Sequence, residues 1–300
     1  MKIVVFCSGA RHLEKKFKTI AKNIKVGESI VEFFPDNELR QRFSKNLDLK
    51  GKDVWFIQSF YKDNRLSIND RIFETLTAFY NAKSLQARKI YLIATYFPYL
   101  REDKRFEKNE AITARAMAWL FSCFNKVFIF EPHLHRLKSF AYWFPKASRV
   151  SLTEFFVNEI KKLKLKQALI IAPDEEAEQW VKPITKKLGF SFVVLKKKRI
   201  NPEKVIIKLN KEMGEKNIII IDDIASTGKT LLEVVKKIKG KNIYCFVFHG
   251  LFVNEKVLSG LKKYARIFTT NTTFSKAIKE RKINVIDITK KIYDIIKNEK

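Results

Sequence analysis

Short, wholly apolar runs alternate with amphipathic stretches along this chain, and that alternation restricts the possible folds most strongly. The runs at residues 3–7 and 126–130 are apolar on both faces, which is typical of buried parallel strands. The stretch at residues 68–82 has the apolar spacing of a helix covering such strands. The sequence therefore predicts an α/β fold of mostly parallel sheets flanked by helices. Further strands are expected at residues 54–58, 89–94, 168–172, 191–195, 217–221 and 243–249, and further helices at 13–23, 111–124, 157–163 and 230–238.

The same pattern occurs in both halves of the 300 residues, which predicts two tandem domains. Each half is long enough to bury its own core. We expect the join near residues 145–150, giving domains over residues 1–147 and 148–300.

The chain carries a strong positive charge, with 60 Lys and Arg against 32 Asp and Glu, a formal net charge of +28. Such a charge attracts nucleic acid, anionic membranes or phosphorylated small molecules. The basic residues are scattered rather than gathered in one block, which favours solvated faces over a nucleic-acid-binding arm. A nucleic-acid partner is therefore not expected.

The three cysteines, at positions 7, 123 and 245, are far apart and give neither a disulfide framework nor a zinc motif. A reducing, cytoplasmic location fits this usage. No window reaches the ~18 apolar residues of a membrane span, and the N-terminus lacks the apolar run of a signal peptide, so no membrane partner is expected.

Residues 218–230, IIIIDDIASTGKT, combine an apolar run, two carboxylates and a Gly-Lys-Thr ending. The ending resembles a nucleotide-binding P-loop, but Asp223 stands where that motif requires its first glycine. Asp222 and Asp223 would also repel a triphosphate laid across the loop. The P-loop interpretation is therefore rejected.

A second interpretation uses every residue of this stretch. A strand over residues 217–221 would bring Asp222 and Asp223 to its end, where their carboxylates can accept hydrogen bonds from a sugar diol. The following loop opens a helix, whose backbone N–H groups can bind one phosphate. The alternative is an ordinary strand–turn–helix junction with surface carboxylates. The functional interpretation predicts a ribose 5-phosphate site, with the phosphate bound by Ser226, Thr227, Gly228 and Thr230.

The stretch resembles the phosphoribosyl-diphosphate (PRPP) motif shared by type I phosphoribosyltransferases and PRPP synthetases, the ribose-phosphate diphosphokinases. Three N-terminal segments resemble only the synthetases: FFPDNE at residues 33–38, YFPYLREDKRF at 96–106 and FEPHLHR at 130–136. The resemblance covers nearly the whole chain. It implies two tandem phosphoribosyltransferase-like domains, with ATP-binding segments in the first and the ribose 5-phosphate site in the second.

The resemblance also implies roles for residues of the first half. Phe34 would stack on the adenine of ATP bound to a neighbouring subunit, while Asp36 and Glu38 accept hydrogen bonds from its edge. The second segment would contact ATP through Arg101, Glu102 and Lys104. Taken alone, the first segment reads as a turn and the second as a charged loop.

Magnesium is the cofactor that the resemblance implies. His133 would contact ATP phosphate and a magnesium ion, and Glu131 replaces the family's aspartate two residues earlier. Asp174, in APDEEAEQW, would bind the ribose and, through water, magnesium. The implied metal residues are therefore Glu131, His133 and Asp174. A zinc site is not implied, because no third or fourth ligand is spaced nearby.

LKKKRINP at residues 195–202 resembles the family's catalytic loop, which makes Lys197 and Arg199 the implied catalytic residues. Lys196 and Lys198 flank the first of these, so the choice of lysine stays open. Several substitutions mark a divergent branch. Ser226 replaces Asp, Lys229 replaces Gly, Glu131 replaces Asp, and Glu176 and Ala177 replace two glycines.

The implied activity is transfer of the diphosphoryl group of ATP to C1 of ribose 5-phosphate, giving PRPP and AMP for nucleotide biosynthesis, by a homo-oligomer (dimer or hexamer). Two alternatives stay open. One is a phosphoribosyltransferase that consumes PRPP. The other is a non-catalytic, PRPP-synthetase-like regulatory or nucleic-acid-binding protein, which the high positive charge would favour.

Overall fold

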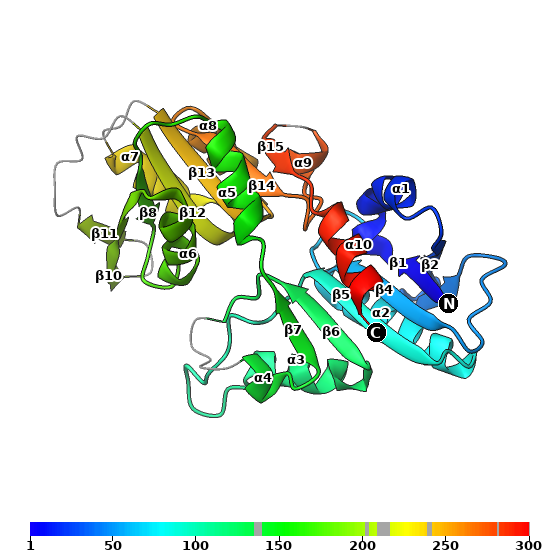
Figure 1. Ribbon diagram of the computed structural model, residues 1–300. Helices are drawn as coiled ribbons and strands as arrows, with labels where there is room; N and C mark the ends of the chain where they lie inside the picture. Colours follow the sequence, from blue (N-terminus) through cyan, green and yellow to red (C-terminus); the bar gives the residue numbers. More distant parts are fainter. Residues whose placement is uncertain (135–139, 202–203, 209–216, 239–241, 281, 300) are drawn as a thin grey trace. The chain divides into compact units, whose positions relative to one another are not determined.

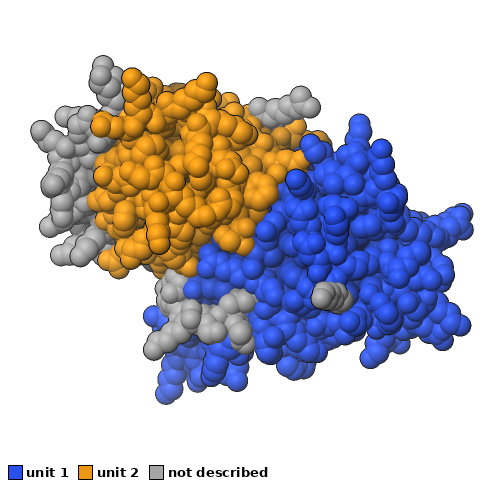
Figure 2. All heavy atoms as spheres, in the orientation of Figure 1, with its two compact units in different colours: residues 1–150, 272–274, 288–300 blue, residues 151–271, 275–287 orange. Residues whose placement is uncertain are grey.

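The computed structural model describes residues 1–134, 140–201, 204–208, 217–238, 242–280 and 282–299; side chains are described for these except at 140–141, 196–201 and 204–208. The chain forms two compact units, distinguished by colour in Figure 2. The first contains Met1–Val150, Thr272–Phe274 and Ile288–Lys300, and the second contains Ser151–Asn271 and Ser275–Asp287. The predicted α/β class, with mostly parallel sheets flanked by helices, is confirmed.

The unit boundaries follow the packing rather than the order of the chain. The first segment of the first unit ends at Val150, three residues beyond the expected join at residue 147, and that join stays a proposal. Two short later segments return to the first unit. One is held there at Thr272, whose carbonyl oxygen accepts hydrogen bonds from Ser59 Oγ (2.6 Å) and Thr95 Oγ1 (2.8 Å).

The first unit is built on a seven-stranded sheet in the order β3-β2-β1-β4-β5-β6-β7 (Figure 1). All neighbouring strands are parallel except β2 and β3, which form an antiparallel pair. The strands are β1 (Lys2–Phe6), β2 (Lys25–Phe33), β3 (Leu39–Phe43), β4 (Asp53–Ser59), β5 (Lys89–Tyr96), β6 (Lys126–Phe130) and β7 (Ala147–Val150). The helices are α1 (Arg11–Ile20), α2 (Ile68–Ser84), α3 (Thr113–Leu120), α4 (Phe140–Trp143) and α10 (Thr289–Asn298), with 3₁₀ turns at Ser8–Ala10 and Phe121–Cys123.

Both faces of this sheet are covered, as its apolar strands require. Ile3 of β1 lies in one core cluster with Ala78 of α2. On the other face Phe6 packs edge-on against Phe17 of α1, with ring centroids 5.4 Å apart. Helix α10 lies beside α1 (Figure 1). Lys2 Nζ donates to the carbonyl oxygen of Ile296 at 2.5 Å, which satisfies an acceptor left over at the end of α10.

The second unit contains a six-stranded, all-parallel sheet in the order β15-β14-β13-β12-β8-β9. A separate antiparallel pair joins β10 and β11. The strands are β8 (Leu169–Ala172), β9 (Ser191–Val194), β10 (Lys196–Asn201), β11 (Lys204–Lys208), β12 (Asn217–Ala225), β13 (Asn242–Gly250), β14 (Arg266–Thr270) and β15 (Asn284–Ile286). The helices are α5 (Thr153–Lys162), α6 (Glu178–Leu188), α7 (Lys229–Lys237), α8 (Glu255–Lys262) and α9 (Lys276–Lys279).

Strand β12 is longer than the sequence predicted, and this changes the setting of two candidate residues. The strand was expected to end at Ile221, but its parallel pairing with β13 continues to Ala225 opposite Gly250. Asp222 and Asp223 therefore lie inside the strand rather than after it. The extension is stabilised by the backbone ladder to β13, which the charge of the two aspartates does not interrupt.

In the part of the chain that the structure describes, no helix combines the length and the apolar character needed to cross a membrane.

One ion pair lies at the amino end of the first sheet. Asp53, at the start of β4, is buried, and both of its oxygens accept hydrogen bonds from Arg88, at 2.8 and 2.7 Å. These hydrogen bonds lower the pKa of Asp53. A carboxyl group whose pKa is lower in the folded state contributes stability above its unfolded pKa, which is ~3.9 for Asp, and loses it as the pH falls through the folded value.

We expect Arg88→Gln to lower the free energy of unfolding at pH 7, with the difference from wild type narrowing as the pH falls below about 4. Denaturant unfolding over a pH series measures this. Lys182→Gln, which removes an exposed helical pair with Glu178, is the control and should change little. A difference independent of pH would contradict this role for the pair.

Candidate functional site

The loop after β12 has the form expected of a phosphate-binding turn. Gly228 has a left-handed backbone (φ 83°) and immediately precedes α7. The carbonyl oxygen of Ala225 accepts from Phe252 N at 3.0 Å, and that of Ser226 accepts from Val253 N at 2.9 Å. These hydrogen bonds fix the loop against the segment that follows β13. The start of α7 then supplies the N–H groups and positive dipole end that favour an anion.

The hydroxyl groups predicted to bind a phosphate lie on this loop and on the first turn of α7. Ser226, Thr227 and Thr230 are half-buried, while Lys229 is exposed. Thr227 Oγ1 accepts a hydrogen bond from Lys229 N at 3.3 Å. The structure therefore gathers the four predicted phosphate-binding residues, including Gly228, within one short turn.

The two aspartates of β12 are each tied to the backbone that follows. Asp222 Oδ1 accepts from Asp223 N at 2.9 Å, and Asp223 Oδ1 accepts from Ile224 N at 2.7 Å. Asp223 is buried and Asp222 is half-buried. Their orientation is thus set by the strand itself, just before the phosphate turn.

Asp174 belongs to the same edge of the second sheet. It follows β8, which pairs in parallel with β12 so that Ile171 lies opposite Ile220. Asp174 Oδ1 accepts from Ala177 N at 3.1 Å, which closes the turn into α6. Neighbouring parallel strands end at the same edge, where ligands of open α/β sheets bind. Three predicted carboxylates and the phosphate turn therefore share that edge.

In the first unit, the segment after β5 carries Arg101, Glu102 and Lys104. Glu102 is anchored to the start of α3, because its carboxylate accepts from Thr113 Oγ1 at 3.0 Å and its carbonyl oxygen from Ala114 N at 3.2 Å. Arg101 and Lys104 are exposed. Both cations therefore lie on the surface after β5, where a polyphosphate can reach them.

The segment after β6, the neighbour of β5, carries Glu131 and His133. Glu131 is fully buried and has an unusual positive φ of 34°. Arg149 Nη2 donates to Glu131 Oε2 at 3.0 Å. His133 is 9% exposed. Since β5 and β6 are parallel neighbours, the two ATP-type segments lie at the same edge of the first sheet.

The turn between β2 and β3 presents its aromatic side chain outwards. Phe34 is 48% exposed, and Asp36 and Glu38 are exposed beside it. The turn is closed by Phe34 N donating to Glu38 O at 2.9 Å, with Asn37 in the left-handed region (φ 69°). An exposed ring flanked by two carboxylates suits the stacking and edge recognition of a purine.

The catalytic predictions fall where side chains are not described. Lys197 and Arg199 lie on β10, opposite Ile207 and Val205 of β11 in the backbone ladder, and their side chains lie outside the described residues. His135 also lies outside them.

Sequence reasoning missed a buried polar network at the carboxyl ends of β1 and β4. Glu74 accepts from Ser8 N at 3.0 Å, and Gln58 Oε1 accepts from Gly9 N at 2.9 Å. A Cβ on Gly9 would lie 2.0 Å from the carbonyl oxygen of Ser59, so only glycine fits there. Arg71, fully buried, pairs with Asp63. Ser8 and Glu74 are 66 positions apart and Gly9 and Gln58 are 49 apart, so no local pattern marks these two contacts.

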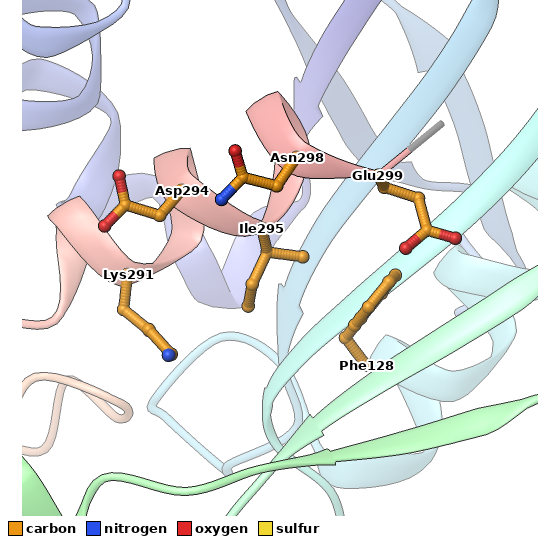
Figure 3. A pocket seen from close by; sticks show the side chains of 6 residues that line it. All are labelled: Phe128, Lys291, Asp294, Ile295, Asn298 and Glu299. Atoms are coloured by element: carbon orange, nitrogen blue, oxygen red, sulfur yellow. The ribbon is translucent and has the colours of Figure 1, made fainter.

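A cavity of about 240 Å³ lies beside α10 in the first unit (Figure 3). Its lining residues are Phe128, Lys291, Asp294, Ile295, Asn298 and Glu299. None of the predicted site residues lines it.

Among the described residues, no group of three or more His, Cys, Asp or Glu side chains could hold a metal ion together. Magnesium, however, is usually bound through one or two carboxylates plus substrate phosphates rather than by an all-protein cage. The half-buried Asp174 fits that mode, since its carboxylate lies at a sheet edge.

Two domain families match the chain in tandem. Residues 3–124 match the N-terminal domain of ribose phosphate pyrophosphokinase, and residues 147–280 match the phosphoribosyl transferase domain. The chain belongs to the ribose-phosphate pyrophosphokinase family. It is 28% identical over 293 residues to the ribose-phosphate pyrophosphokinase of Pyrococcus abyssi, covering 96% of this chain and 97% of that protein. The enzyme of Pyrococcus furiosus is 28% identical over 275 residues, covering 90% and 94%.

The same fold occurs in a crystal structure of phosphoribosylpyrophosphate synthetase from Mycobacterium smegmatis. The match has a TM-score of 0.82 and covers 99% of this chain and 98% of that one, at 19% sequence identity. The structural match therefore extends over both units of this chain.

We expect Gly228→Ala to weaken binding of ribose 5-phosphate at least about tenfold, because a left-handed backbone disfavours alanine and the turn must shift. The added Cβ itself meets only ordinary contacts, the nearest at 3.6 Å. The strain should also lower stability by about 1–2 kcal/mol.

Gly189→Ala is the matched control, because Gly189 ends α6 with φ 72° and has open space around it. It should cost similar stability and leave sugar-phosphate binding unchanged. Calorimetric titration and denaturant unfolding measure both quantities. Equal losses of binding in the two variants would contradict a phosphate role for the turn.

Proposed function

We propose that this chain is a ribose-phosphate diphosphokinase, which transfers the diphosphoryl group of ATP to C1 of ribose 5-phosphate and forms PRPP and AMP for nucleotide biosynthesis. The main support for the proposal comes from one edge of the second sheet. Three carboxylates lie there together with a helix N-terminus that follows a left-handed glycine. One phosphate and a vicinal diol fit this arrangement. The named activity of the Pyrococcus relatives over nearly the full chain supports it.

In the second unit, Ser226, Thr227, Gly228 and Thr230 bind the 5-phosphate. Asp222 and Asp223 accept hydrogen bonds from the ribose hydroxyls. Asp174 holds the sugar near C1. In this assignment the positive end of the helix dipole binds the phosphate anion. The carboxylates accept hydrogen bonds from the neutral hydroxyl groups of the sugar.

In the first unit, Arg101 and Lys104 neutralise the polyphosphate of ATP, Glu102 holds that segment on α3, and His133 contacts a phosphate. Phe34, Asp36 and Glu38 bind the adenine of ATP in a neighbouring subunit. That last role makes the active protein a homo-oligomer. A cytoplasmic location belongs to the same proposal, and the three free cysteines fit it.

In the reaction, the C1 hydroxyl oxygen attacks the β-phosphorus of ATP. A bond forms between the C1 oxygen and the β-phosphorus, and the bond from the β-phosphorus to the α,β-bridging oxygen breaks. AMP leaves with that bridging oxygen, and the hydroxyl proton is released to solvent. Such transfers depend on positioning and neutralisation of charge. Lys197 and Arg199 close over the transferred group. Magnesium bound with the phosphates would supply further positive charge. In the first unit His133 would hold one such ion, and in the second unit Asp174 would hold one through water.

A phosphoribosyltransferase could use the same phosphate turn to consume PRPP. The ATP-type segments after β5 and β6 favour the synthetase. A non-catalytic, nucleic-acid-binding protein is the other candidate, supported only by the scattered positive charge.

The direct assay is AMP release from ATP and magnesium, with and without ribose 5-phosphate. AMP and PRPP should appear together, and only with the sugar phosphate. PRPP consumption that requires a free base would indicate the transferase instead. Salt-sensitive binding of arbitrary DNA without turnover would indicate the non-catalytic protein.

We expect Arg199→Ala to lower kcat by about 10³-fold while changing the KM values for ATP and ribose 5-phosphate far less, because the cation acts on charge that develops in the transition state. Lys182→Ala, an exposed cation on α6, is the control. Steady-state kinetics measure both. A rise in KM with kcat unchanged would refute the role.

Phe34→Ala should raise the KM for ATP about tenfold, because stacking on a base contributes ~1–3 kcal/mol. Phe73→Ala removes a similarly exposed ring (52%) from α2 and should leave this KM unchanged. If both variants behave alike, Phe34 does not bind adenine.

A further inference from the structure

Glu131 is a buried carboxylate that is bound to β7, an edge strand of the first sheet. Its N–H donates to the carbonyl oxygen of Val150 at 3.0 Å. Its Oε2 accepts from Arg149 Nη2 at 3.0 Å, and its side chain is 0% exposed against 39% for the arginine. A carboxylate removed from water in this way needs a compensating charge, which the guanidinium supplies.

These two contacts constrain the segment after β6 that is proposed to bind ATP. Glu131 follows β6 directly and has a positive φ of 34°, which an unconstrained glutamate disfavours. His133, two residues later, is nearly buried. The hydrogen bond to Val150 and the ion pair to Arg149 therefore hold the backbone in a disfavoured conformation just before the histidine.

The ion pair also bears on the metal role implied for Glu131. A guanidinium at Oε2 places a positive charge where a divalent cation would have to bind that oxygen, and the two cations repel each other. Binding of magnesium through Oε2 would require the pair to break and the arginine to move. The geometry favours an anchoring carboxylate over a metal ligand.

We propose that Arg149 is a positioning residue for the nucleotide: it holds Glu131, and through it the Glu131–His133 turn, in the conformation that contacts ATP phosphate, while Glu131 serves as an anchor and not as a ligand of magnesium. The inference rests on the proposed function, since it takes ATP as the ligand of this turn. No sequence motif marks Arg149, which the pairing of β6 with β7 brings beside the turn.

The test compares Arg149→Gln with a matched control in the same unit. Arg88→Gln also removes an arginine from a buried carboxylate, Asp53, but at the amino end of the sheet. The full chain is titrated calorimetrically with magnesium and α,β-methylene-ATP, whose bridging bond cannot be cleaved, and thermal unfolding is recorded for each variant.

R149Q should weaken binding of the analogue about tenfold or more, as loss of an orienting partner does at comparable sites. The KM for ATP should rise with it, and the KM for ribose 5-phosphate should not. R88Q should lower thermal stability while leaving the affinity for the analogue unchanged. Arg149→Lys, which keeps the charge but not the planar donor, should bind with intermediate affinity. It serves as the test variant should R149Q not fold.

Glu131→Gln distinguishes the two possible roles of Glu131, as an anchor of the turn or as a metal ligand. As an anchor, it should weaken binding no more than R149Q does, and the double variant E131Q/R149Q should bind like either single variant. As a metal ligand, E131Q would raise the magnesium concentration needed for half-saturation and R149Q would not; that result overturns the inference.

The remaining outcomes are equally decisive. Equal affinity for the analogue in R149Q and wild type overturns the inference alone, and so do additive losses in the double variant. A wild-type chain that does not bind the analogue overturns the proposed function and the inference with it.

Discussion

Parallel pairing between neighbouring strands is the interaction on which both candidate sites depend. In the second unit, the ladder that sets Ile220 beside Ile171 and Cys245 brings the ends of β8, β12 and β13 to one edge. In the first, the ladder between β5 and β6 does the same for two charged segments. Residues far apart in the chain thereby share one surface. Burial of apolar side chains fixes the positions of the strands. Polar side chains near the carboxyl ends of neighbouring strands are then brought together.

The fold class and the start of α7 after Gly228 were accessible from the sequence, because both depend on local patterns. The apolar runs of β1 and β6 mark strands buried on both faces. The succession of carboxylates, hydroxyls and Gly228 marks a helix start suited to an anion. The extent of β12 was not accessible, since Ile224 and Ala225 join the strand only through their partners His249 and Gly250 on β13.

Other features depend on contacts between distant residues. Arg149 on β7 pairs with Glu131 at the end of the neighbouring strand β6. Gln58 accepts a hydrogen bond from the N–H of Gly9, 49 positions away. Helix α10 is fixed to the first unit by Lys2, 294 positions earlier. No local spacing predicts such pairs. The structure pairs the carboxylate of Glu131 with the cation of Arg149, a contact that the sequence does not indicate.

Phosphorus-31 NMR of a single reaction mixture distinguishes transfer of the diphosphoryl group from transfer of the γ-phosphoryl group. With ATP, magnesium and ribose 5-phosphate, AMP and a C1-linked diphosphate should accumulate in equal amounts as ATP disappears. Appearance of ADP with a sugar bisphosphate would show transfer of the γ-phosphoryl group, and would contradict the assignment of this chain as a diphosphokinase.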